Sequence, residues 1–335
     1  MAKKLPRRQF IAGTGVAISF PSVILSCSAE ESAPLQRGKE SLVAIARQPG
    51  VLQPQNSLKT SAVAHLLDES MRAIGETKQP LDSWKRLFGK DDTVGIKINT
   101  LGGRMLSPHP ELVEIIAQRL VEVGVSPRRI LIWDRMESEL QRAGFPPGKF
   151  KEKGIVIGTD HEQIGYEREP SMSGSIGSCF SRIISHVCTA LINVGILKDH
   201  DLSGTSVAMK NLFGLIHNPN RYHFDVNKDP YLPDLCLHPY VKNKLRLTVC
   251  DAFRGQYDGG PAYKSSRTWD FDGILVSRDQ VALDAVAAEI LAEERKKRNL
   301  KSLKEENREP LYIQLAEEKT LGWADMAKIN KKEIT

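Results

Sequence analysis

The chain has 335 residues, with 47 lysines and arginines against 41 aspartates and glutamates, a formal net charge of +6. Four basic residues, Lys3, Lys4, Arg7 and Arg8, stand at its start; without them 43 basic residues face 41 acidic ones and the net charge is +2. A nearly neutral chain has little electrostatic attraction for nucleic acid, so we expect no nucleic-acid partner.

Residues 1–27 are predicted to be an export signal. Their basic start is followed by an apolar stretch that Gly13, Gly15 and Pro21 interrupt, and this stretch is too short and broken for a stable membrane span. The adjacent Arg7 and Arg8 resemble a twin-arginine signal, which the twin-arginine export machinery recognises on folded proteins.

A lipid anchor is predicted at Cys27. The sequence ILSC that ends there resembles a bacterial lipobox, with an aliphatic residue three positions before the cysteine and a small residue directly before it. We therefore expect a periplasmic or cell-surface lipoprotein; an uncleaved anchor or ordinary cleavage nearby is the alternative. Residues 28–60, which begin with the polar run SAEESAPLQRGKES, are predicted to be a tether, and 61–335 the folded domain.

Strands and helices are predicted to alternate along the folded domain. A strand with the sequence VGIKI starts at Val94, a glycine-containing loop follows, and a helix is expected from Pro110 to Gly124. The segment RRILIWD then gives a strand that ends at Asp134. Strand, helix and strand in this order form the building block of a parallel sheet.

The same alternation continues towards the C-terminus. A helix is expected from Gln280 to about Glu293, the charged run EERKKRNLKSLKEENREP is expected to be solvated, and a last short helix is expected near the end. The predicted fold is therefore α/β, with a mostly parallel or mixed sheet flanked by helices, in one large domain or two tightly packed lobes. Further strands are predicted at 154–158, 190–197, 245–253 and 273–277.

The cysteines give no cluster or zinc motif. Once Cys27 is assigned to a lipid, the others contain no C-x-x-C pair, so neither a ferredoxin-type cluster nor a zinc ribbon is expected. One or two disulfides would suit an exported protein, but the spacing does not reveal the pairing. The four remaining cysteines are Cys179, Cys188, Cys236 and Cys250.

Polar side chains follow four of the predicted strands. In an open parallel sheet the loops at the carboxyl ends of the strands hold the ligand, so we expect these side chains to converge on one crevice. Ser203 and Gly204, with Lys210 and Asn211 after them, could offer backbone N–H groups and a cation to an anion; surface lysines in ordinary turns are the alternative. The residues after the strand ends are Lys97 and Asn99, Asp134, Lys198 to Asp201, and Asp251.

Histidines supply the expected proton-transfer chemistry. His200 is the predicted general acid or base, and His109, which lies between two prolines, either contacts a ligand or caps the following helix. No H-E-x-x-H or H-x-H pair is present, so no metal ligands are predicted and the cofactor stays open. The absence of G-x-x-x-x-G-K-[ST], G-x-G-x-x-G and G-x-S-x-G argues against a P-loop, a dinucleotide-binding loop and a serine hydrolase.

The segments VGIKINT, LINVGILKDHDLSGTSVAMKNLFGLI, VCDAF and GILVSRDQVALDAVAAEIL resemble, in that order, the domain of unknown function 362 family, over Val94 to Ile334. The resemblance implies an α/β domain, sometimes joined to iron–sulfur modules whose cysteines this chain lacks, and it implies no settled activity. A weaker likeness of architecture to nickel-pincer lactate racemases is an analogy only. The recurring family positions correspond to Lys97, Asn99, Lys198, His200, Ser203, Gly204, Lys210, Asn211 and Gly214.

Two classes of function follow from these features. The first is an exported enzyme that carries out proton-transfer or redox chemistry on an anionic small molecule, with His200, Lys198 and Lys97 as catalytic residues. The second is a non-catalytic lipoprotein that captures an anionic ligand or a metal. In both classes the predicted ligand-binding residues are Asn99, His109, Asp134, Ser203, Gly204, Lys210, Asn211 and Asp251.

Overall fold

The computed structural model describes residues 38–223 and 229–335. The predicted export signal, the predicted lipidation site Cys27 and the first part of the predicted tether lie outside the described residues. All described residues belong to one unit of the chain.

A ten-stranded sheet forms the centre of the described residues. Its main path has the order β14–β1–β13–β11–β9–β4–β5–β6, and every strand on this path except β13 runs in the same direction. The strands of this path are β1 (Ser41–Arg47), β4 (Val94–Lys97), β5 (Ile130–Asp134), β6 (Ile155–Gly158), β9 (Ala190–His200), β11 (Leu245–Gln256), β13 (Gly273–Ser277) and β14 (Ile329–Ile334). The short strands are β2 (Leu52–Gln53), β3 (Ser57–Leu58), β7 (Ser171–Ser173), β8 (Ile176–Ser178), β10 (Gly204–Thr205) and β12 (Thr268–Asp270). The predicted mostly parallel α/β fold is confirmed.

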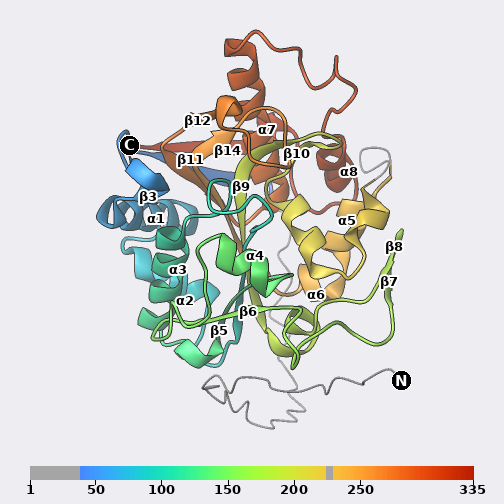
Figure 1. Ribbon diagram of the computed structural model, residues 1–335. Helices are drawn as coiled ribbons and strands as arrows, with labels where there is room; N and C mark the ends of the chain where they lie inside the picture. The colour runs from blue at the N-terminus through green and yellow to red at the C-terminus, as the bar shows by residue number, and fades with distance from the viewer. Residues whose placement is uncertain (1–37, 224–228) are drawn as a thin grey trace, which may run out of the picture. The chain divides into compact units, whose positions relative to one another are not determined.

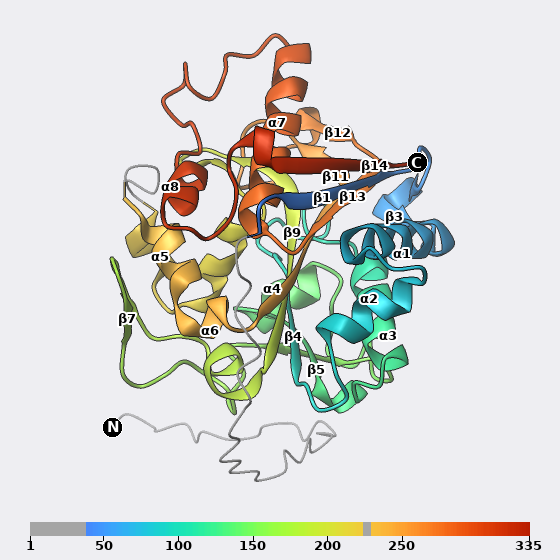
Figure 2. The same ribbon diagram turned by 180° about the vertical axis from the view of Figure 1, so that it is seen from behind.

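Helices cover both faces of this sheet. On one face lie α1 (Thr60–Gly75), α2 (Pro80–Leu87), α3 (Pro110–Glu122) and α4 (Glu137–Arg142). On the other lie α5 (Tyr231–Leu237), α6 (Pro239–Lys242), α7 (Gln280–Lys297) and α8 (Tyr312–Glu318), as Figures 1 and 2 show from opposite sides. Each layer of helices packs its apolar side chains on the sheet, which gives two separate buried clusters.

The helix α3 shows how the sequence determines one of these elements. Pro110 occupies its first turn, where the missing N–H costs nothing, and Gly124 just beyond its end has φ +98°, a left-handed value that suits glycine. The side chains of Leu112, Ile116 and Leu120 recur at helical spacing and are fully buried. Burial of each such side chain contributes roughly 1.5–3 kcal/mol.

Three sequence expectations are corrected at the edge of the sheet. Strand β1 lies within the predicted tether 28–60, because the apolar residues of SLVAIAR are buried between β13 and β14. The segment before the C-terminus forms β14, parallel to β1, where a helix was expected. The charged run EERKKRNLKSLKEENREP, which begins inside α7, is not all solvated, since Arg295 is 1% exposed.

The long strand β9 places polar residues beyond the end of its neighbour. Lys97, the last residue of β4, pairs with Asn193, so β9 continues for seven further residues to His200. At Gly204 the chain turns back with φ +72°, pairs with β9 as β10, and enters the 3₁₀ helix η4 (Met209–Leu215). Gly195 allows this return segment to pack closely, because a Cβ there would lie 2.3 Å from the carbonyl oxygen of Val207.

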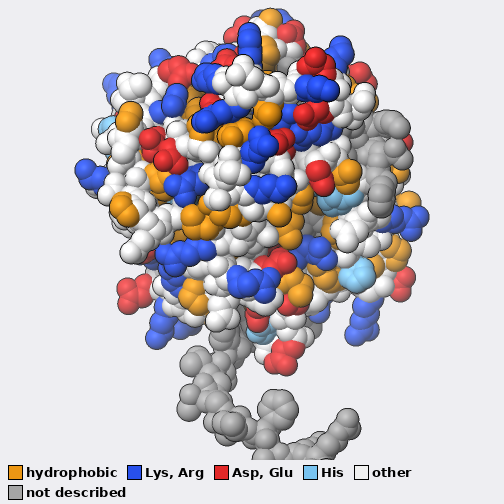
Figure 3. Space-filling view, turned by 45° about the horizontal axis from the view of Figure 1, so that its top comes forward, with side chains coloured by type: hydrophobic (Ala, Val, Ile, Leu, Met, Phe, Trp, Pro, Cys, Tyr) orange, Lys and Arg blue, Asp and Glu red, His pale blue; other side chains and the backbone are white. Residues whose placement is uncertain are grey.

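The described surface mixes charges of both signs. On the face drawn in Figure 3, basic and acidic side chains alternate without a large patch of either sign. No helix in the described ranges is both long enough and apolar enough to cross a membrane.

Candidate functional site

A cavity of about 360 Å³ opens at the carboxyl ends of β9, β4 and β5, with η4 on one side. Its volume lies near the lower end of the range of about 300–1,000 Å³ that is typical of small-molecule pockets. The lining residues are Lys97, Asn99, Leu101, Asp134, Arg135, Met136, Glu139, Lys198, His200, Ser206, Lys210, Asn211, Phe213, Gly214, Pro219, Asn220, His223 and Pro261.

Lys97 is held by three acceptors at the base of this cavity. Its Nζ lies 2.8 Å from Asp134 Oδ1, 3.0 Å from Asn211 Oδ1 and 2.6 Å from the carbonyl oxygen of Ile98. An ammonium has three donors, so these contacts use all of them. Lys97 therefore has no donor left for a ligand.

Asp134 is the counter-ion of Lys97 and is itself fully hydrogen-bonded. Its Oδ2 accepts bonds from the backbone N and the hydroxyl of Thr100, at 2.8 and 2.7 Å, and its Oδ1 accepts one from Arg135 N. Burial would raise the pKa of Asp134, but the Lys97 ammonium and the Thr100 donors outweigh burial and keep this pKa below its ordinary value. Asp134 is therefore a buried carboxylate that stays ionised.

The 3₁₀ helix η4 is anchored to α7 before Lys210 and to the sheet after it. Asp284 on α7 accepts hydrogen bonds from the backbone N of Ala208 at 2.6 Å and of Met209 at 3.0 Å. Asn211 Nδ2 donates to Asn193 Oδ1 at 2.7 Å, which joins η4 to β9. Lys210 thus extends from a backbone that is anchored before and after it.

Gly214 leaves room for the lysine–aspartate pair. A Cβ at this position would lie 2.6 Å from both Cε and Nζ of Lys97 and 3.2 Å from Asp134 Oδ1. Because Lys97 is held by three acceptors, it cannot easily move away from a larger side chain. The glycine in this part of η4 is therefore required by packing.

Lys210 has a buried amine without a hydrogen-bond partner among the described residues. The residue is 5% exposed, and its Nζ lies 4.9 Å from the centroid of the Phe213 ring. Burial lowers the pKa of Lys210 to about 7; Lys198 adds to this effect and Asp201 opposes it. Leaving a buried polar group unpaired costs about 1–3 kcal/mol. An amine that loses its charge near neutral pH reduces this cost.

The lowered pKa predicts how Lys210 changes stability with pH. An unfolded lysine binds its proton up to about pH 10.4, whereas the folded state releases it near 7, so stability should rise between these pH values. The Lys210→Met variant should lack this rise, which amounts to about 1.4 kcal/mol per unit of pKa difference. Urea unfolding of the wild type and of Lys210→Met at pH 7 and 9.5 measures this rise in stability. The same pH dependence in the two proteins would contradict the prediction.

Lys198 is the second available amine. It is 1% exposed, and its Nζ lies 3.5 Å from Asn99 Oδ1, too far for a strong hydrogen bond. Burial lowers the pKa of Lys198 to about 8, while Asp134 and Asp199 oppose that effect. Lys198 is therefore mostly protonated at pH 7, and Lys210 is only partly protonated.

Two histidines face each other at the cavity, with ring centroids 5.7 Å apart. Burial and the charge of Lys210 lower the pKa of His200 to about 2, so its ring is neutral and Nδ1 accepts a hydrogen bond from Leu202 N at 3.1 Å. The Asp201 carboxylate, 2.9 Å from the same Nδ1, would instead accept a hydrogen bond from a ring that carries its proton on Nδ1. The neutral tautomer that accepts the bond from Leu202 N carries its proton on Nε2.

His223 has the opposite tautomer. Its Nδ1 lies 2.9 Å from the carbonyl oxygen of Pro219, to which it donates, and this leaves the lone pair on Nε2. Burial, followed by the charge of Lys210, lowers the pKa of His223 below its ordinary value. The cavity therefore has one imidazole that can donate a hydrogen bond and one that can accept a proton.

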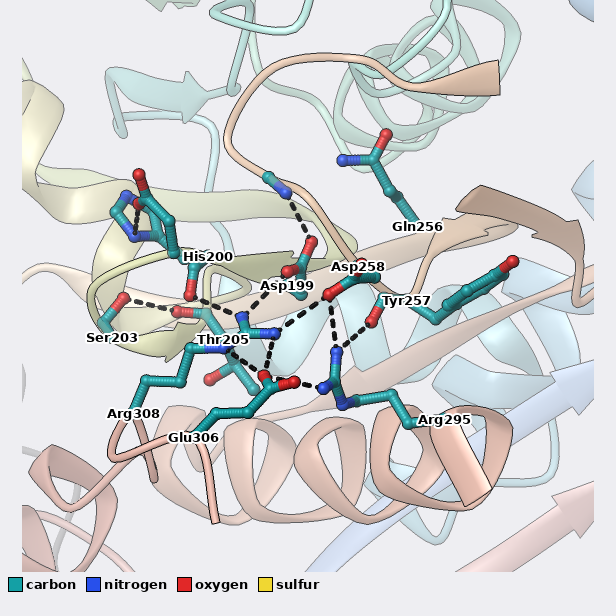
Figure 4. Close-up of polar contacts among 12 residues, drawn as sticks. Asp199, His200, Ser203, Thr205, Gln256, Tyr257, Asp258, Arg295, Glu306 and Arg308 are labelled. Atoms are coloured by element: carbon teal, nitrogen blue, oxygen red, sulfur yellow. Dashed lines mark hydrogen bonds and ion pairs between the residues drawn. The ribbon is translucent and has the colours of Figure 1, made fainter. Parts of the chain in front are cut away.

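A network of charged residues holds the C-terminal end of β9 in place. Arg308 donates to Asp199 Oδ2 at 3.0 Å and to the carbonyl oxygen of His200 at 3.1 Å, as Figure 4 shows. Arg308 and Arg295 both donate to Asp258 Oδ1, at 3.0 and 2.9 Å, and both pair with Glu306. These contacts hold the backbone that presents Lys198 and His200.

Four predicted ligand-binding residues do not line the cavity. Asp251 Oδ2 accepts a hydrogen bond from His109 N at 2.7 Å and contacts His109 Nδ1 at 2.9 Å, on the face of the sheet that α3 covers. Ser203 donates to the carbonyl oxygen of Thr205, and Gly204 is the first residue of β10. The other predicted binding and catalytic residues line the cavity together.

His223 is the site residue that the sequence did not single out. Its spacing from His217 and His200 matches no motif, and His217 instead packs its ring on Tyr166 at 5.1 Å, away from the cavity. The turn made by Pro219–Tyr222 brings His223 back towards β9. The position of His223 at the cavity therefore depends on how this segment folds.

Residues 94–289, more than half of the chain, match the family described as Domain of unknown function (DUF362). The chain belongs to the DUF362 family. All residues that line the cavity lie within the matched DUF362 segment, whereas Arg295, Glu306 and Arg308 lie beyond it. No curated protein matches the sequence.

The described part of this DUF362 protein has neither a cluster of metal ligands nor a disulfide. Within residues 38–223 and 229–335, no group of three or more His, Cys, Asp or Glu side chains could hold a metal ion. Cys179, Cys188, Cys236 and Cys250 are free thiols, of which Cys179 alone is partly exposed.

Proposed function

We propose that this DUF362 protein is an enzyme that transfers a proton on an anionic small molecule bound between Lys198, Lys210 and the two histidines. The observation that carries the proposal is the buried amine of Lys210, which lines a cavity and has no partner among the described residues. Unpaired buried polar groups are rare in folded proteins because they are costly, and titratable groups with strongly shifted pKa values cluster at functional sites.

The proposed roles follow from the charge of each group. Lys198 binds the anionic group of the substrate, because it is the more fully protonated of the two available amines. His223 accepts the proton through Nε2, and His200 donates a hydrogen bond from Nε2 to the developing negative charge. Lys97 and Asp134, whose hydrogen bonds are already satisfied, position the site.

The experiment measures exchange of carbon-bound hydrogen for deuterium in D₂O by proton NMR. The substrates are a panel of small 2-oxo acids, other carboxylates and phosphate esters, with an enzyme-free blank. Wild-type protein should accelerate exchange in at least one compound. The His223→Gln variant should lose exchange but retain binding, and Lys198→Met should lose binding.

His186→Gln provides a matched control, because His186 is exposed and lies outside the cavity. It should leave exchange unchanged. A protein that only captures an anion needs the two lysines but no base. Binding of a compound without exchange of any compound in the panel would therefore overturn the enzyme proposal in favour of capture.

A further inference from the structure

We propose that the substrate is a carbonyl compound, a 2-oxo acid, whose carbonyl carbon forms an imine with Nζ of Lys210 while its carboxylate pairs with Lys198. This inference rests on the proposed proton transfer at the same site and names its substrate class. In the step, the amine adds to the carbonyl carbon, a C=N bond replaces the C=O bond, and the oxygen leaves as water.

The choice of Lys210 follows from a comparison of the buried lysines. Lys97 donates all three of its hydrogens to Asp134, Asn211 and Ile98, so its nitrogen has no free lone pair. Lys198 also lines the cavity, but its Nζ has Asn99 Oδ1 as an acceptor at 3.5 Å. Lys210 combines a position in the cavity with an unpaired nitrogen, which is the state that an attacking amine needs.

The surroundings of Lys210 favour the neutral, nucleophilic amine. The residue is 5% exposed, its Nζ lies above the Phe213 ring, and Lys198 lies near enough to repel a second positive charge. A desolvated lysine beside another cation is a recognised way to activate an amine. The burial of Lys210 lowers its pKa to about 7, so a large neutral fraction exists under physiological conditions.

The backbone around Lys210 also suits covalent chemistry. Asp284 anchors the two residues before it, and Asn211 anchors the residue after it to β9. The amine is thus presented on a fixed segment, which lowers the entropic cost of aligning it with a bound carbonyl. An imine at this position also makes the neighbouring C–H acidic, and this provides the proton that His223 accepts.

Reductive trapping tests the inference. The full protein is incubated with pyruvate or 2-oxobutyrate and cyanoborohydride, and intact mass and peptide mapping follow the product. We expect one adduct on the peptide that contains Lys210, with the mass of the acid less one oxygen atom. Lys210→Arg should lose at least ten-fold in adduct, and Lys198→Met should need a higher acid concentration for the same yield.

The surface lysine variant Lys85→Arg is the control, because Lys85 is 62% exposed and should not change the yield. Adducts spread over surface lysines, or none on the Lys210 peptide of the wild-type protein, would overturn the inference even if Lys210→Arg failed to fold. Deuterium exchange without an adduct would remove the imine but leave the proposed function intact. An adduct without exchange would support the imine and overturn proton transfer.

Discussion

Replacing Asp134 with asparagine is expected to lower the free energy of unfolding by about 3–5 kcal/mol, because the change leaves the buried Lys97 ammonium without its counter-ion. The residue is 6% exposed and Lys97 is 1% exposed, so water cannot replace the lost charge. Asparagine retains an oxygen for the Thr100 donors at Oδ2. The loss therefore comes from the missing charge and from the Nδ2 donor that replaces Oδ1, the acceptor of Lys97 Nζ and Arg135 N.

The pH dependence of this loss has a defined sign. The pKa of Asp134 is lower in the folded protein than its ordinary value, so its contribution is present above the unfolded pKa of 3.8 and disappears as the pH falls through the folded value. Urea unfolding should show a large difference between wild type and Asp134→Asn at pH 7 and a smaller one at pH 3.

Two further variants separate the ion pair from a general effect of the substitution. Adding Lys97→Met to Asp134→Asn should restore part of the lost stability, since it removes the unpaired charge. Asp82→Asn removes one partner of an exposed pair, in which Lys85 lies 4.0 Å away, and should change little. Equal losses in Asp82→Asn and Asp134→Asn would contradict the importance of burial.

The central part of the fold could be predicted because its strands are short apolar runs that end in polar residues. The segments that became β4, β5 and β13 have this pattern, and the predicted helix from Pro110 agrees with α3. Strand β14, with the sequence INKKEI, lacks this pattern, whereas β1, with the sequence SLVAIAR, has it although it lies within the predicted tether. Each is far in sequence from the rest of the sheet, and their pairing depends on contacts that no local pattern encodes.

The site residues differ in how far the sequence could reveal them. Lys97, Asp134 and Lys198 follow apolar strands, and the neighbouring positions of β4, β5 and β9 bring them together. The sequence could not show that Lys97 has satisfied hydrogen bonds while Lys210 does not, because both are lysines near polar residues. Charge type is visible in the sequence, but the number of available partners is a property of the folded structure.

Arg308→Met is expected to lower the free energy of unfolding by about 3 kcal/mol, because it leaves the carboxylate of Asp199 buried without its cation. The side chain of Asp199 is fully buried, and Gly260 N at 2.8 Å would be its remaining donor among the bonds described. The substitution also removes the hydrogen bond from Arg308 to the carbonyl oxygen of His200. It should therefore weaken pyruvate trapping at Lys210 in addition to lowering stability.

The loss of unfolding free energy caused by Arg308→Met should increase with pH. Burial already raises the pKa of Asp199, and removing Arg308 raises it further, so the folded variant takes up a proton that the unfolded chain releases above about pH 4. Stability of the variant then falls as the pH rises towards the folded pKa, which urea unfolding at pH 5 and 8 measures. Arg72→Met is the control, because Arg72 pairs with Glu69 at the exposed surface. If both variants behave alike at both pH values, Arg308 does not hold the end of β9, and the position of His200 must depend on the sheet alone.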